Sequence, residues 1–187
     1  MYRPSVLRGK GIRANNIPRS SYTRRHTVLH TPHVHHALRE VNLLDSHTWL
    51  RENLGLLQQA AYCAALVEQT TETDTPLPAF FALFDSLLAS LAGHEPLPQT
   101  VFAFELKLLQ ELGLSPDWQK TKLTPGARQL LEKLLTLDWA GLARLRLSPA
   151  QTAEIRHFLH GFLVYHLGKL PATREQALLA TGQTMRG

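Results

Sequence analysis

The sequence predicts a mainly α-helical protein, in which a C-terminal helical bundle follows a short β segment. Apolar residues recur at the spacing of a helix face over most of residues 45–180. Capping residues and prolines precede these stretches, and glycines follow several of them. Alternating β-branched patterns appear within residues 22–44. We therefore expect a basic arm with a partial β segment at 1–44, a helical domain at 45–180 and a frayed tail at 181–187.

The stretch 97–116 is the expected centre of the bundle. Pro98 and Thr100 favour a helix start, and Gly113 favours its end. Burial of one Leu or Phe side chain contributes about 1.5–3 kcal/mol, so a helix with apolar residues on several sides needs neighbours. The apolar positions are Phe102, Leu106 and Leu109 on one stripe, and Val101, Phe104, Leu108 and Leu112 on others.

The flanking chain supplies the neighbours of this central helix. Capping boxes begin at Ser148 and Thr173, and proline follows Thr124 and Ser148 at the first helical position. Tyr165 and His166 are expected at the rim of the core. The further helices are predicted at 49–69, 75–93, 124–137, 148–167 and from 173 onward, and Asp138 is expected to cap a short turn through Leu145.

The positive charge of the chain belongs to its N-terminal arm. Residues 1–39 hold eight Lys and Arg and no acid, whereas the remainder holds 12 bases against 15 acids. Residues 1–25 are rich in turn formers, which leaves three interpretations open. They form a solvated tail, an arm that binds nucleic acid through its phosphates, or an organelle transit peptide, although Pro4 and Pro18 interrupt an amphipathic helix.

Histidines gather in the expected β segment. Two short strands are predicted at 27–30 and 34–41, with Thr31-Pro32 between them. His33 and His35 would share a strand face, as zinc or copper ligands do, but no acidic or thiolate partner is close in sequence. Exposed strand histidines are therefore the favoured interpretation. The group is His26, His30, His33, His35 and His36.

No motif for catalysis or cofactor binding is found. The single cysteine, Cys63, excludes an internal disulfide and a cysteine-built zinc site. Gly9-Lys10-Gly11 lacks the spacing of a phosphate-binding loop. Glu154, His157, His160 and His166 give only half of a carboxylate-bridged metal motif. We expect no enzyme, no cofactor and no metal, and, without a transmembrane-length run or a secretory signal, a cytoplasmic protein that does not bind membranes.

Four segments, in this order and spacing, resemble the bacterial recombination mediator family RecO. They are 38–46 (LREVNLLDS), 102–116 (FAFELKLLQELGLSP), 147–149 (LSP) and 162–169 (FLVYHLGK), and the likeness covers about residues 36–180. The resemblance implies an OB-fold barrel before the helical domain. This N-terminus is too short for a complete barrel, so 5–13 and 22–43 would form an incomplete OB-like β segment. Either the barrel is abbreviated or the chain starts inside a longer product.

The resemblance also bears on metal and function. Many family members carry a four-cysteine zinc ribbon after the central helix, but residues 118–123 have no cysteine and no room for it, so no zinc is expected. A RecO-like protein would be a non-enzymatic, nucleoid-associated mediator of DNA repair and recombination. It would bind single- and double-stranded DNA, the acidic C-terminal tail of single-strand-binding protein, and RecR, and assist annealing or recombinase loading.

Candidate binding residues follow from this resemblance and from charge. The DNA-binding candidates are Arg8, Lys10, Arg13, Arg19, Tyr22, Arg24 and Arg25. The candidates for the rim of a peptide-binding groove are Lys120, Lys122, Arg128 and Lys133, chosen on charge alone. Two other functions stay open: a helical protein–protein adaptor that has lost DNA binding, and a histidine-based metalloenzyme.

Overall fold

A computed structural model describes residues 24–25, 42–43, 45–72 and 77–179. The chain divides into two units, Met1–His47 and Thr48–Gly187. In the first unit, β1 (Arg24–Arg25) pairs antiparallel with β2 (Asn42–Leu43), with Arg24 opposite Leu43. The strands predicted at 27–30 and 34–41 lie outside the described residues, as does the predicted tail at 181–187.

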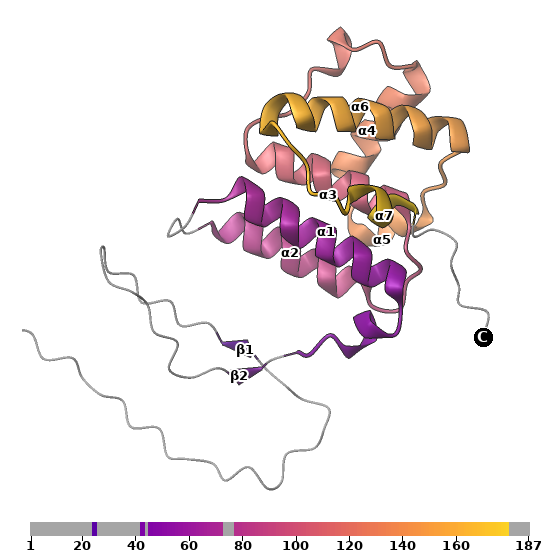
Figure 1. The fold of residues 1–187 in the computed structure, drawn as a ribbon. Helices are drawn as coiled ribbons and strands as arrows, with labels where there is room; N and C mark the ends of the chain where they lie inside the picture. Colours follow the sequence, from indigo (N-terminus) through magenta and orange to yellow (C-terminus); the bar gives the residue numbers. More distant parts are fainter. Residues whose placement is uncertain (1–23, 26–41, 44, 73–76, 180–187) are drawn as a thin grey trace, which may run out of the picture. The chain divides into compact units, whose positions relative to one another are not determined.

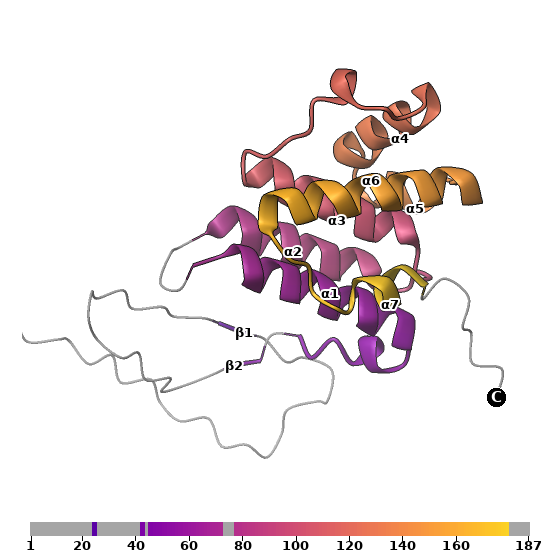
Figure 2. The ribbon, with the colours of Figure 1, turned by 45° about the horizontal axis from the view of Figure 1, so that its top comes forward.

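The second unit is helical, which confirms the predicted fold class. Figures 1 and 2 show α3 between the α1–α2 pair and α6, with α7 beside α1. The elements are η1 (Thr48–Arg51), α1 (Leu54–Thr70), α2 (Pro78–Leu91), α3 (Pro98–Glu111), η2 (Trp118–Lys120), α4 (Pro125–Thr136), α5 (Trp139–Arg144), α6 (Pro149–Leu167) and α7 (Arg174–Leu179).

The central helix predicted around 97–116 is α3, which packs against each of α1, α2, α4, α5, α6 and α7. Pro98 stands in its first turn, and Gly113, with φ of +70°, follows its end. The Leu114 N–H then donates to the Leu109 carbonyl at 2.8 Å, as in a Schellman end. The fully buried apolar side chains of α3 are Val101, Phe102, Ala103, Phe104, Leu106, Leu108 and Leu109.

Polar side chains tie helix ends to their neighbours by donating to carbonyls at or beside those ends. The Lys107 ammonium of α3 donates to the carbonyls of Leu135 and Leu137, at 2.7 and 3.1 Å, where α4 ends. The buried Gln59 amide of α1 donates to the Leu97 and Ala177 carbonyls, at 3.0 and 3.2 Å. The ends of α3, α4 and α7 are thus fixed by side chains from other helices.

Helix starts show which local signals are reliable. Ser148 and Gln151 form the predicted capping box of α6. The box predicted at Thr173 is wrong, because its buried Oγ1 has no hydrogen-bond partner. The helix predicted from 75 is α2, which begins at Pro78. The helix predicted at 49–69 divides into η1 and α1, because the Asn53 side chain accepts from the Leu56 N–H and caps α1.

Candidate functional site

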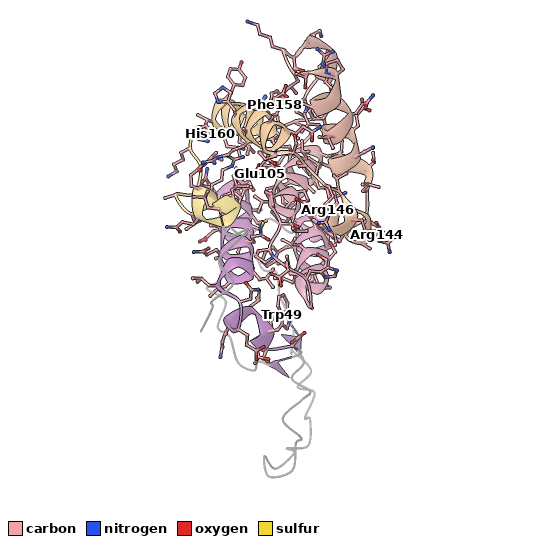
Figure 3. The ribbon with its side chains drawn as sticks, turned by 90° about the vertical axis from the view of Figure 1, so that its right-hand side faces the viewer. Trp49, Glu105, Arg144, Arg146, Phe158 and His160 are labelled. Atoms are coloured by element: carbon pink, nitrogen blue, oxygen red, sulfur yellow. The ribbon has the colours of Figure 1, made fainter. Side chains whose placement is uncertain are left out.

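A buried ionic cluster joins three helices at the centre of the bundle. Glu105 of α3 is 0% exposed and Arg174 of α7 is 3% exposed. Arg174 donates from Nε to Glu105 Oε1 at 2.6 Å and from Nη2 to Oε2 at 2.9 Å. The Tyr62 hydroxyl of α1 donates to the same Oε1 at 2.6 Å. Figure 3 shows Glu105 inside the bundle.

The surroundings of this cluster shift the pKa values of Tyr62 and Arg174. Burial, followed by the Glu105 charge, raises the pKa of Tyr62 far above its ordinary value, so the hydroxyl stays a donor. Burial lowers the pKa of Arg174, but the hydrogen bonds and charge of Glu105 outweigh this, so the net pKa is raised. Both Glu105 oxygens are occupied and the carboxylate has no exposed surface. The cluster is therefore a structural clasp of α1, α3 and α7, with no free oxygen for acid–base work.

Three of the four basic residues proposed for the rim of a peptide groove, Lys120, Lys122 and Arg128, lie within residues 120–128. We call this segment the basic loop. Lys120 is exposed and pairs with Asp117 at 2.9 Å, and its hydrogen bond to that carboxylate raises the pKa of Lys120. Lys122 is exposed. Arg128 is half-buried, and its Nη2 donates to the Thr121 carbonyl at 2.9 Å. The arginine thus holds the basic loop against the first turns of α4.

Lys133 is exposed near the other end of the same helix. Five residues separate it from Arg128, which places the two about 140° apart around the helix axis. The buried Ala127, Leu130, Leu131 and Leu134 occupy the opposite side of α4. The structure therefore groups Lys120, Lys122 and Arg128, and sets Lys133 apart from them.

A row of aromatic and imidazole rings runs along one flank of α6. Ring centroids are 6.2 Å apart for Trp118 and Phe158, 6.0 Å for Phe158 and Phe162, and 4.4 Å for Phe162 and His166. Tyr165 meets the His166 ring edge-on at 4.9 Å. We call these five residues the α6 ring row. Tyr165 is 84% exposed, so the prediction that it lies at the rim of the core is wrong.

Most of the predicted DNA-binding residues cannot be placed. Arg8, Lys10, Arg13, Arg19 and Tyr22 lie outside the described residues. Arg24 and Arg25 are the two residues of β1, which pairs with β2. The N-terminal histidines of the metal hypothesis also lie outside the described residues.

The histidines of α6 can be placed. His157 and His160 are both exposed on the helix, and Figure 3 labels His160 there. Glu154 is engaged elsewhere, because its carboxylate accepts from the Thr124 N–H at 2.7 Å and from the Thr124 hydroxyl at 2.9 Å. Within 24–25, 42–43, 45–72 and 77–179, no three His, Cys, Asp or Glu side chains gather as metal ligands do.

Residues 51–121 match the family model "Recombination protein O C terminal". The matched stretch runs from the end of η1 through α3 to just beyond η2, and so contains the central helix, its first two neighbours and Glu105. The proteins named DNA repair protein RecO in Myxococcus xanthus (30% identical), Anaeromyxobacter sp. strain K (27%) and Bacillus pumilus (25%) are similar over 64%, 73% and 65% of this chain. These matches support a RecO-type protein. The resemblance recognised in the sequence is thereby confirmed.

The RecO-type match extends over part of each relative. The chain spans 60%, 67% and 60% of the lengths of the Myxococcus, Anaeromyxobacter and Bacillus proteins. No solved structure matches the chain significantly. Among the described helices, none is long and apolar enough to cross a membrane.

Sequence reasoning missed both the clasp and the exposure of the ring row. A glutamate flanked by Phe104 and Leu106, in the helix predicted to be central, was one available signal of a buried carboxylate that needs a cation. The partner, Arg174, is 69 residues away, which no local pattern connects to it. For the ring row, the signal was the stretch 155–173. It contains no acid and has four pairs of aromatic or histidine residues spaced three or four positions apart.

Proposed function

We propose that this chain is a RecO-type mediator of DNA repair and homologous recombination, which binds DNA and single-strand-binding protein and assists annealing or recombinase loading. The observation that carries the proposal is the family match over residues 51–121, which contains the central helix α3. The relatives named as DNA repair proteins support the same role. The clasp at the centre of the bundle is structural, which favours a mediator that performs no catalysis.

The proposed DNA contact is the basic arm. Its residues are Arg8, Lys10, Arg13, Arg19, Tyr22, Arg24 and Arg25, and the first 39 residues contain no acid to oppose them. Lysine and arginine near phosphates release condensed counterions, so the affinity depends strongly on salt. The remaining chain has more acids than bases and is a poorer electrostatic partner for DNA. Fluorescence anisotropy of labelled oligonucleotides, with the wild-type chain and an arm-neutralised variant, tests this contact.

The proposed peptide contact is the basic loop. Lys120, Lys122 and Arg128 lie together where η2 leads into α4, and apolar Leu123 between them is buried. The acidic tail of single-strand-binding protein is the proposed ligand, and Lys133 contributes only at long range from its separate position. We expect Lys122→Glu to weaken binding of the tail peptide more than Lys133→Glu does. Equal losses in an isothermal titration would remove the basic loop as the site.

One observation favours the alternative of a helical adaptor without DNA binding. Beyond residue 39 the chain has 12 bases against 15 acids. An adaptor would bind the tail peptide or RecR but no oligonucleotide at moderate salt. The mediator would bind both classes of ligand. For the mediator we propose a cytoplasmic, nucleoid-associated location.

A further inference from the structure

The α6 ring row is an exposed surface without an assigned role. Phe158, Phe162 and His166 recur every fourth residue, so they lie on one flank of the helix. Trp118 of η2 extends the row beyond Phe158, and Tyr165 extends it beyond His166. Phe158 and Phe162 are half-buried, whereas His166 is exposed and Tyr165 is 84% exposed. The row therefore passes from the packed core to open solvent along a single helix.

The sequence around the row is free of acids. From Ile155 to Thr173 the chain has no carboxylate, and Lys169 is exposed just beyond the end of α6. His157 lies about 180° around the helix from His166, and His160 about 160° from Phe162, so neither borders the row. The three acids that flank the row are each engaged by a neighbour. Glu154 accepts from Thr124, Glu175 pairs with Arg156, and Asp117 pairs with Lys120.

We propose that the α6 ring row is a stacking site for single-stranded DNA on the helical unit. Proteins that bind single strands stack successive bases on aromatic side chains next to a positively charged surface. Here the exposed rings are Tyr165 and His166, and the basic side chain nearest to them in sequence is Lys169. The inference rests on the proposed function, since DNA is the ligand, and adds a contact that is separate from the basic arm.

The exposure of Tyr165 favours a base over an acidic peptide as the occupant. An apolar peptide end gains affinity by filling a desolvated pocket. Tyr165 instead is 84% exposed in the last turn of α6, so its ring does not fill such a pocket. A nucleobase needs only that face, because every base can stack on it regardless of sequence.

The test uses the full chain and a fluorescein-labelled oligothymidylate in anisotropy titrations. We expect Tyr165→Ala to weaken binding about tenfold, and Tyr165→Phe, which keeps the ring, to stay within about twofold of wild type. Phe81→Ala is the matched control, because Phe81 is 65% exposed but lies on α2, outside the ring row. It should bind like wild type. A bromodeoxyuridine-substituted oligonucleotide should photocrosslink to Tyr165 or His166.

The outcomes separate this inference from the proposed function. If Tyr165→Ala binds like wild type while arm neutralisation abolishes binding, the ring row is not a DNA site and the mediator proposal stands. If the wild-type chain binds no oligonucleotide, the DNA contact of the proposed function fails and the ring row fails with it. Loss of binding to an aspartate-rich peptide ending in phenylalanine, without loss of oligonucleotide binding, would also overturn the inference.

Discussion

Arg174, the first residue of α7, donates two hydrogen bonds to the carboxylate of Glu105 in the middle of α3. The pair links residues 69 positions apart, and Tyr62 adds α1 to it through the same carboxylate. Arginine suits this position, because its planar fork can satisfy both oxygens at once. The last described helix is therefore held by a buried charge pair as well as by its buried Ala177 and Leu178.

We expect Arg174→Met to destabilise the helical unit severely. It leaves the Glu105 carboxylate buried without its cation, which typically costs about 3–5 kcal/mol of unfolding free energy. Arg156→Met is the matched control, because the Arg156–Glu175 pair is partly exposed and such pairs contribute at most about 1 kcal/mol. Urea denaturation measures both. Similar losses for the two variants would contradict a buried clasp.

Replacing both partners of the clasp tests the same idea from the other side. The double variant Glu105→Leu, Arg174→Met removes both charges and keeps apolar volume at each position. Because a buried pair can be replaced by apolar residues at little cost, we expect it to regain part of the stability that Arg174→Met loses. The recovery is incomplete because the buried Tyr62 hydroxyl loses its acceptor, which costs about 1–3 kcal/mol. A double variant as unstable as the single one would show that the charges themselves supply the stability.

Alkaline pH should reveal the contribution of the Tyr62 hydroxyl to stability. The folded protein holds the pKa of Tyr62 far above 10.0, whereas the unfolded chain ionises near that value. Above pH 10 the folded state therefore binds more protons than the unfolded state, and stability falls as the pH rises. Tyr62→Phe removes this contribution, so its unfolding free energy should fall less steeply above pH 10 than that of wild type.

The same variant also has a cost at neutral pH. Tyr62→Phe removes a hydrogen bond to a carboxylate, which contributes about 1.5–3 kcal/mol. Buried Cys63, whose pKa burial raises, is present in both proteins and so does not affect the comparison. Parallel stability curves for wild type and variant from pH 8 to pH 11 would contradict the assigned role of the hydroxyl.

Local patterns in the sequence were sufficient for much of the fold. The apolar stripes of Phe102 and Leu106 predicted that α3 would be central, and Ser148 with Gln151 predicted how α6 begins. These signals succeed because helix periodicity and capping act over a few residues. Thr173 does precede α7 as predicted, but its side chain does not cap the helix. The partner of the next residue, Arg174, is Glu105, far away in the chain.

The candidate sites were less predictable than the fold. Charge alone put Arg128 and Lys133 in one group, but the turn of α4 separates them. The apolar pattern of its helix predicted that Tyr165 lies at the rim of the core. The residue instead stands in the last turn of α6 and is 84% exposed. Surface groupings depend on where helices cross and end, which a linear pattern does not specify.

Lys107 of α3 should stabilise the end of the neighbouring helix α4. Lys107→Met removes donors from the carbonyls of Leu135 and Leu137, and we expect a loss of about 1–3 kcal/mol of unfolding free energy. The exposed Lys133 is the matched control, since Lys133→Met should change stability by less than about 0.5 kcal/mol. Hydrogen exchange of the last turn of α4 should quicken only in the first variant.

The salt dependence of DNA binding should show how many arm charges reach phosphates. For single strands, the logarithm of the binding constant falls with the logarithm of salt concentration by about 0.7 for each neutralised phosphate. We expect replacement of Arg8, Lys10 and Arg13 by glutamine to reduce this slope by about 2, because three charges are lost.

The matched variant for this slope carries Lys120, Lys122 and Lys133 replaced by glutamine, which removes equal charge from the helical unit. It should keep nearly the wild-type slope, because the proposed role of these lysines is toward a peptide. A slope that changes equally in both variants would show that DNA responds to the net charge of the whole chain, and would remove the arm as the specific DNA contact.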